Sequence, residues 1–154
     1  MEFNVTASKR LKPIKNLADK TEKNAAQDLG KSLSYQQDQI NKLSQLIGYR
    51  EEYLVKISHQ SQTGVSGARL QQYHRFLNKL NSAITEQRET VKVSENHVVE
   101  KKGHWRQKNS RAQAIGKAVE KLKSKEKTQT SRKEMIQADE LSTQAFIRNS
   151  KMAM

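Results

Sequence analysis

Residues 70–98 read LQQYHRFLNKLNSAITEQRETVKVSENHV, and their apolar side chains recur at alternating steps of three and four residues. The same ladder continues to residue 147, and fourteen of its twenty-three positions are apolar. These are Leu70, Tyr73, Leu77, Leu80, Ile84, Val91, Val98, Trp105, Ala112, Ile115, Val119, Leu122, Ile136 and Ile147. A period of 3.5 residues keeps one narrow line of side chains facing a partner helix. The ladder therefore predicts a long coiled-coil helix over about residues 67–148.

The composition of the 154-residue chain fits an elongated helical protein better than a globule. Hydrophobic residues make up 34% and aromatic residues 5%, whereas 29% are charged. This is too little apolar material for a large core, but a contact between two helices needs less. One proline and six glycines leave long helices uninterrupted. We predict an all-α chain that forms a single rod-like coiled-coil domain over residues 1–154.

A second ladder upstream predicts a first helix over about residues 13–61. Its positions are Leu29, Leu33, Gln36, Ile40, Leu43, Ile47, Arg50, Leu54 and Ile57. Pro13 suits the first helical turn, where the missing N–H has no helical partner to lose. Ile14 and Leu17 fall on a different register, which predicts a stutter near residues 25–30.

The uncharged segment SQTGVSG at residues 61–67 predicts a turn over about residues 62–66. Gly64 can adopt the left-handed conformation that ends the first helix, and Ser66 can cap the second. Two amphipathic helices joined by so short a turn bury their ladders against each other as an antiparallel hairpin. With the turn centred near Gly64, opposing residue numbers total about 128, because both helices rise about 1.5 Å per residue.

The second helix is longer than the first, so its C-terminal end should overhang. Residues 123–134 contain no apolar side chain, and residues 101–134 carry twelve Lys or Arg against three Glu. A helix without tertiary packing is only marginally stable. We predict an end that is frayed in isolation and becomes ordered on a partner. The apolar residues available for that contact are Met135, Ile136, Leu141, Phe146 and Ile147.

Some apolar side chains lie beside the ladders rather than on them. These are Leu46, Tyr49 and Tyr53 on the first helix, and Phe76 and Ala83 on the second. The pairing rule places Tyr53 opposite residue 75 and Leu46 opposite residue 82, so the two groups form one apolar patch near the turn. The patch either widens the contact between the helices or serves as a docking surface for another protein. Both interpretations stay open at this point.

Patterns of catalytic and metal-binding residues are absent from the sequence. There is no cysteine and no glycine-rich phosphate loop, and the four histidines are not paired with carboxylates at ligand spacing. The sequence also lacks a signal peptide and an apolar run of the roughly 20 residues that span a bilayer. We expect a non-enzymatic cytoplasmic protein without cofactor or metal. Its net charge of +13 attracts acidic surfaces, but interleaved aromatics and DNA-binding motifs are missing.

Several short motifs, in this order and spacing around the glycine turn, resemble the FliJ family of flagellar type III export proteins. They are NAAQDLG at 24–30, LIGYREEY at 46–53, GVS at 64–66, YHRFLNKL at 73–80, Ala83-Ile84 with Gln87, and Trp105-Arg106 with Lys108. The resemblance spans about residues 14–147. Its most specific parts are Tyr49 with Tyr53, and Tyr73, Phe76 and Leu80. Asp139-Glu140 resembles an acidic pair near the C-terminus of the family.

The resemblance implies an antiparallel coiled coil similar to the central stalk of rotary ATPases. Such a stalk couples the hexameric export ATPase FliI to the export gate protein FlhA, assists export chaperones, and lies in the cytoplasm at the inner-membrane export apparatus. The gate-facing residues would be Leu46, Tyr49, Tyr53, Phe76, Leu80, Ala83 and Gln87. The ATPase-facing residues would lie at the helix ends, namely Lys123, Lys125, Lys127, Arg132, Lys133, Ile136 and Phe146. A stalk of a virulence type III secretion system, and a basic coiled-coil tether or nucleic-acid binder, remain alternatives.

Overall fold

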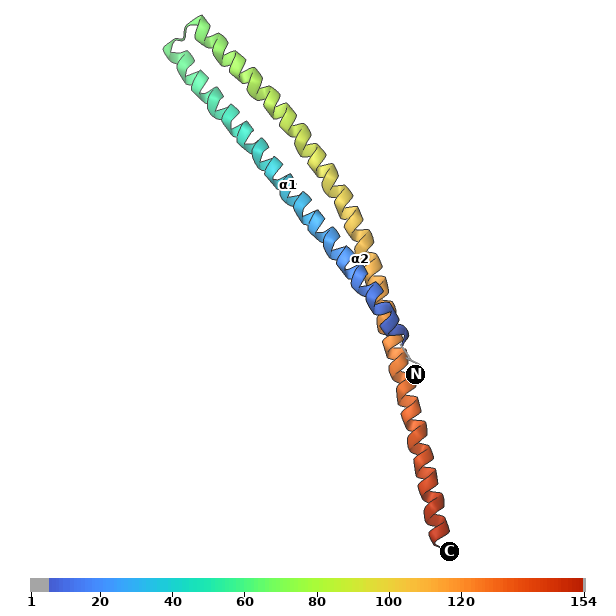
Figure 1. The fold of residues 1–154 in the computed structure, drawn as a ribbon. Coiled ribbons are helices and arrows are strands. Elements are labelled where there is room, and N and C mark those ends of the chain that lie inside the picture. Colours follow the sequence, from blue (N-terminus) through green and yellow to red (C-terminus); the bar gives the residue numbers. More distant parts are fainter. Residues whose placement is uncertain (1–5, 154) are drawn as a thin grey trace. The chain divides into compact units, whose positions relative to one another are not determined.

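The computed structural model describes residues 6–153, which form two long helices joined by a short turn (Figure 1). Helix α1 spans Ala7–Thr63 and helix α2 spans Gly67–Met152. Within residues 6–153 there is no strand. The two helices pack against each other as an antiparallel hairpin in which α2 is the longer, so the predicted fold class is confirmed.

In the turn between the helices, Gly64 and Ser66 have their predicted roles, but α1 continues to Thr63, so the turn spans residues 64–66 rather than 62–66. Gly64 has a positive φ of 91°, in the left-handed region that ends helices and favours glycine. Ser66 caps α2, because its Oγ accepts a hydrogen bond from the Arg69 N–H at 3.3 Å and its carbonyl accepts one from the Leu70 N–H at 3.1 Å. The end of α1 and the start of α2 therefore have defined geometry, and residues 64–66 connect the two helices.

Helix α1 begins at Ala7, earlier than the predicted start near Pro13. The Thr6 carbonyl accepts the Arg10 N–H at 3.1 Å, so the helical bonding is established before the proline is reached. Pro13 lies inside α1 and removes one backbone hydrogen bond there. The first turn of α1 has an anchor outside the helix, because Ser8 bonds to Glu126 of α2. Local helix signals in the sequence cannot indicate this contact, because Ser8 and Glu126 lie 118 residues apart in the sequence.

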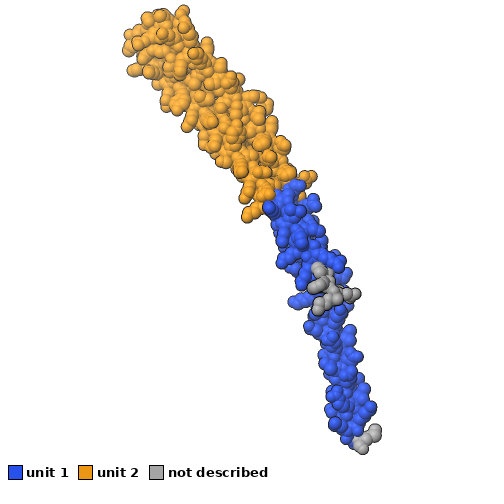
Figure 2. All heavy atoms as spheres, in the orientation of Figure 1, with its two compact units in different colours: residues 1–22, 108–154 blue, residues 23–107 orange. Residues whose placement is uncertain are grey.

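The chain divides into two compact units (Figure 2). Residues 23–107, here called the turn unit, contain the turn and the adjoining parts of both helices. Residues 1–22 and 108–154, here called the terminal unit, contain the start of α1 and the rest of α2.

In the turn unit, the α2 side of the helix contact follows the predicted ladder. We call the line of covered residues at this contact the seam. On α2 it consists of Tyr73, Leu77, Leu80, Ile84, Gln87, Val91, Ser94, Val98, Lys101 and Trp105. Ile84 is the most deeply buried large side chain, with 1% of its surface exposed. The ladder from Tyr73 to Trp105 is confirmed, including its polar steps.

The α1 side of the seam differs from the prediction at every second position. The covered residues with this spacing are Ala25, Leu29, Ser32, Gln36, Gln39, Leu43, Leu46, Arg50, Tyr53, Ile57 and Gln60. Leu33, Ile40, Ile47 and Leu54 each lie one residue further along, beside the seam. The prediction followed the apolar residues, but two ladders one residue apart share every other position, and contact with α2 selects the one containing Ser32 and Gln39.

The predicted stutter near residues 25–30 is wrong. In the terminal unit the seam residues of α1 are Ser8, Leu11, Lys15, Ala18 and Glu22, and the alternation of three and four residues continues through Ala25 and Leu29. Ile14 and Leu17, whose spacing suggested a change of register, are exposed. The register is constant, because the seam here runs through Lys15, Ala18 and Glu22 instead of Ile14 and Leu17.

Residues 127–153, here called the C-terminal extension, have no seam. Every one of them is exposed, and Glu126 is the last covered residue of α2. The extension is nevertheless helical to Met152, where the sequence predicted a frayed end. Its backbone is satisfied within the helix, and Thr128, Thr130 and Thr143 each donate to the carbonyl four residues earlier. Low stability of this unpaired helix remains a prediction. Neither helix holds, within the described residues, a stretch apolar and long enough to traverse a lipid bilayer.

Candidate partner-binding surfaces

An aromatic cluster joins the two helices near the turn. The ring of Tyr53 lies 5.8 Å from that of Tyr73 in an edge-to-face arrangement and 4.4 Å from that of Phe76. The pairing rule placed Tyr53 opposite residue 75, so this juxtaposition is confirmed. Loss of hydration at the helix contact, and secondarily Tyr73, raise the pKa of Tyr53 above its ordinary value.

The exposed aromatic side chains at and beside this cluster are Phe76 and Tyr49. Tyr49 precedes Tyr53 by four residues and shares its helix face, and 57% of Tyr49 and 48% of Phe76 are exposed. Leu46 and Tyr53 belong to the seam, so the prediction that they lie beside it is wrong. Residue types alone could not separate them, because an apolar side chain suits either position.

The remaining residues of the predicted gate-facing set support the helix contact. Leu80 is buried and Ala83 is half-buried. The side-chain amide of Gln87 donates to the backbone carbonyl of Gln39 at 2.9 Å and to its Oε1 at 3.0 Å. Gln39 is itself buried, so this pair satisfies polar groups inside the seam and fixes its register. The first-helix ladder passed over Gln39, and only the polar step at position 87 of the second ladder hinted at such a pair.

The predicted ATPase-facing residues lie in the terminal unit on the last covered turns of α2 and in the C-terminal extension. All of them are exposed, and Ile136 and Phe146 carry the larger apolar surfaces among them. A surface of this charge attracts acidic partners over the range that salt screening allows.

A hydrogen-bonded clamp marks the end of the seam in the terminal unit. Glu126 accepts the Ser8 N–H on Oε1 at 3.1 Å and the Ser8 hydroxyl on Oε2 at 2.6 Å. The hydroxyl bond first, and the backbone bond second, lower the pKa of Glu126. The carboxylate also sits at the N-terminus of α1, where the helix dipole favours negative charge. The sequence pattern does not indicate this role of Glu126, although Glu126 occupies a step of the second ladder.

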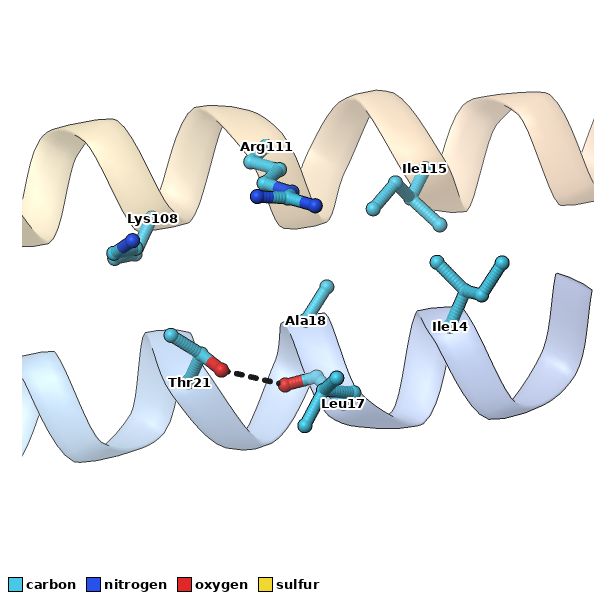
Figure 3. Close-up of a pocket in the computed structure, with 7 residues that line it drawn as sticks. All are labelled: Ile14, Leu17, Ala18, Thr21, Lys108, Arg111 and Ile115. Atoms are coloured by element: carbon cyan, nitrogen blue, oxygen red, sulfur yellow. Dashed lines mark hydrogen bonds between the residues drawn. The ribbon is translucent and has the colours of Figure 1, made fainter.

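A shallow pocket lies between the helices of the terminal unit (Figure 3). It has a volume of about 180 Å³ and is lined by Ile14, Leu17, Ala18, Thr21, Lys108, Arg111 and Ile115. The Thr21 hydroxyl donates a hydrogen bond to the Leu17 carbonyl of its own helix at 2.8 Å. The lining contains no carboxylate, imidazole or thiol, so it offers no metal ligands and no acid–base pair. Across residues 6–153, no three histidine or acidic side chains gather closely enough to hold a metal.

The hairpin fold defines a two-helix coiled-coil protein with exposed apolar and basic side chains on its surface. Comparison with known proteins identifies the family. The sequence model of the family described as "Flagellar FliJ protein" matches residues 8–151, and the chain belongs to the FliJ family. The chain is also 28% identical, over 138 residues, to the Flagellar FliJ protein of Escherichia coli (strain K12), covering 90% of this chain and 94% of that protein. No solved structure matches. The family resemblance drawn from the motifs is thereby confirmed.

Proposed function

We propose that the chain is a non-enzymatic component of the flagellar type III export apparatus that couples the export ATPase to the export gate and assists export chaperones. The family match over residues 8–151 carries this proposal and supports a flagellar export component. The protein would act in the cytoplasm and reach the inner membrane through its partners. Two exposed surfaces, one in each compact unit, are available for two different partners.

The gate protein FlhA would bind the turn unit at Tyr49 and Phe76. These two side chains expose the most aromatic surface of the cluster, and their burial by a partner is favourable at roughly 25 cal/mol per Å² of apolar surface. Leu46, Tyr53, Leu80, Ala83 and Gln87 would act indirectly, by holding the two helices in register beneath the contact. The proposal therefore divides the seven residues by role.

The ATPase FliI would bind the basic end of α2. Lys123, Lys125, Lys127, Arg132 and Lys133 would face acidic groups of the ATPase ring, and complementary charge of this kind mainly raises the association rate. Ile136 and Phe146 would add apolar contact. Coupling then consists of a difference in the free energy of binding between nucleotide states of the ring, so the chain needs no nucleotide site of its own.

The gate contact is tested with Tyr49→Ala and Phe76→Ala in purified full-length protein. Both variants should weaken binding to the gate protein at least about tenfold, the order expected for removing a central aromatic anchor, with little change in melting temperature. Val55→Ala is the matched control, because Val55 is 70% exposed and lies away from the cluster. Unchanged gate binding in both aromatic variants would refute the assignment of this surface.

The ATPase contact is tested by deleting residues 129–154, which leaves the Ser8–Glu126 clamp in place. Stimulation of the hexameric export ATPase should be lost while gate binding is retained. Full stimulation by the truncated chain would contradict the proposed coupling. Co-purification with a virulence-type ATPase instead would favour the secretion-stalk alternative, and micromolar, steeply salt-dependent binding to random DNA would favour a nucleic-acid binder.

A further inference from the structure

Helix α1 in the turn unit has a second line of regularly spaced residues, each one position after a seam residue. Its members are Leu33, Gln37, Ile40, Ser44, Ile47, Glu51 and Leu54, here called the α1 line. Its spacing of four and three residues is that of a coiled-coil seam. Leu33 is 47%, Ile40 37% and Leu54 46% exposed, so no part of this chain covers the α1 line.

A matching line runs along α2 on the same side of the hairpin. Its members also follow seam residues by one position and are His74, Asn78, Asn81, Thr85, Arg88, Lys92 and Glu95, here called the α2 line. In an antiparallel pair, residues one position after the seam on either helix lie on the same side. The hydrogen bonds of Gln39 with Gln87 and of Arg50 with Asn81 agree with the rule that level residue numbers total about 128.

The α1 line is complementary to a reversed copy of itself. With a two-fold axis near Ser44, an antiparallel second copy brings its Leu54 against Leu33 and its Ile47 against Ile40. Large apolar side chains thus meet large apolar side chains at all four positions, and each gains a partner that its own chain does not provide. An isologous contact of this kind closes after two copies.

The same axis also makes the α2 line self-complementary. Because level residue numbers total about 128, the axis passes near Thr85 of α2. It sets the Arg88 guanidinium against the side-chain amide of Asn81 of the second copy, which can accept a hydrogen bond. It sets the Glu95 carboxylate against the imidazole of His74, which can donate one.

Charge on this face permits self-association in a chain whose net charge is +13. Along the two lines, Arg88 and Lys92 are balanced by Glu51 and Glu95, and the antiparallel arrangement sets no two like charges opposite each other. The face is therefore nearly neutral, as contact between two identical basic chains requires. A parallel second copy would instead set the apolar α1 line against the polar α2 line, so the antiparallel direction is favoured.

We propose that the α1 and α2 lines form the interface of an antiparallel homodimer, in which each turn unit covers the other. A face about 31 Å long and two helix diameters, about 20 Å, wide gives roughly 1,200 Å² for both copies together. That is the lower end of the area of stable interfaces, so we expect a dissociation constant in the micromolar range.

The homodimer leaves the candidate gate surface open. Tyr49 and Phe76 each precede a seam residue by one position, so they lie on the other side of the hairpin from the two lines. The interface also uses no residue of the C-terminal extension. The inference goes beyond the proposed function, because it assigns a second copy of this chain to a face that the proposed contacts with gate and ATPase leave unused.

Sedimentation equilibrium of the full-length chain over the micromolar range tests the dimer. Ile40→Glu should weaken dimerisation at least about tenfold, because each substituted side chain would face Ile47 of the second copy. Val55→Glu is the matched control, since it adds the same charge at a 70% exposed site off both lines. Combining Ile40→Glu with Ile47→Lys should restore at least about tenfold of the affinity, because only an antiparallel pair brings these two positions together.

Cross-linking tests the position of the axis, since the chain contains no cysteine. Ser44→Cys and, independently, Thr85→Cys lie at the axis, so a short bismaleimide should join two copies of either variant. Ser34→Cys is the control, because its two copies would lie about 28 Å apart along the helices at a rise of about 1.5 Å per residue. Circular dichroism verifies that every variant keeps its helical content.

Several results would overturn the proposal. A chain that stays monomeric throughout the micromolar range would do so, as would an equal loss of dimer in Val55→Glu or no recovery in the double variant. A dimer in which neither Ser44→Cys nor Thr85→Cys cross-links better than Ser34→Cys would place self-association on another surface. A concentration-dependent dimer with the expected order of variants and both axial cross-links supports the interface.

Discussion

Helix α2 has tertiary contacts in the turn unit but none in the C-terminal extension. In the turn unit, residues such as Ile84 and Ser94 are almost fully buried against α1. In the extension, apolar residues such as Ile136 and Phe146 are exposed, and the helix makes only its own backbone and threonine hydrogen bonds. The local sequence is helix-forming in both parts. We therefore expect tertiary contact to make the turn unit more stable than the extension.

The largest expected effect contrasts two isoleucines of α2. Ile84→Ala should lower the free energy of unfolding by about 3 kcal/mol, because it removes a buried side chain and leaves a cavity. Ile136→Ala should change it by less than about 0.5 kcal/mol, since Ile136 is exposed. Urea unfolding followed by circular dichroism measures both. Equal losses would mean that the extension is packed like the turn unit.

A smaller effect is expected from the buried amide pair. Gln87→Ala removes both hydrogen bonds to Gln39 and leaves the buried Gln39 side chain unpaired, which should destabilise the protein by about 1–2 kcal/mol. Gln107→Ala, at an exposed position of the same helix and unit, is the control. A Gln87→Ala variant as stable as the control would show that Gln39 is not enclosed in the seam.

The clamp between Ser8 and Glu126 should give a weak pH dependence of stability. Because the pKa of Glu126 is lowered in the folded protein, the clamp stabilises above the unfolded pKa of about 4.5 and is lost as the pH falls through the folded value. Ser8→Ala should therefore lower the melting temperature at pH 7, and this effect should decrease as the pH falls below about 4.5. Ser110→Ala, at an exposed site in the same unit, serves as control. A difference in melting temperature that stays the same as the pH is lowered from 7 through the acid range would argue against a role for ionised Glu126.

The smallest expected effect concerns Leu17, which the sequence pattern counted among the apolar positions of the first helix. Since Leu17 is 66% exposed, Leu17→Ala should change the free energy of unfolding by less than about 0.5 kcal/mol. The corresponding change at the seam, Leu11→Ala, should be larger, because Leu11 is half-buried against α2. A larger loss of unfolding free energy for Leu17→Ala than for Leu11→Ala in a urea titration would contradict the constant register and support the predicted stutter.

The sequence predicted the hairpin, the turn and the α2 seam because each depends on local chemistry. Gly64 and Ser66 have conformational and capping preferences of their own, and the apolar positions of α2 fall on a single ladder. The α1 seam could not be obtained in this way. Its alternate positions include Ser32 and Gln39, which are buried through contact with α2 rather than through hydrophobicity. Leu33 and Ile40 beside them gave the stronger apolar signal.

The candidate surfaces could also be predicted from the sequence only in part. Tyr49 and Phe76 were identified from their positions off the ladders, and they are exposed. The exposure of Leu33, Ile40 and Leu54 was not predicted, because the first ladder places them on the seam, one position away from the residues that α2 covers. Glu126 was missed because its partner, Ser8, lies 118 residues away in the sequence.

Hydrogen exchange of the isolated full-length protein tests the central claim most directly, since it reports the stability of each part of α2 separately. Amides of residues 84–98 should exchange at least about a hundredfold more slowly than those of residues 129–148, because opening the seam costs the global free energy of unfolding whereas the extension opens locally. Equal and strong protection along all of α2 would contradict the account, because it would require a seam where every side chain is exposed.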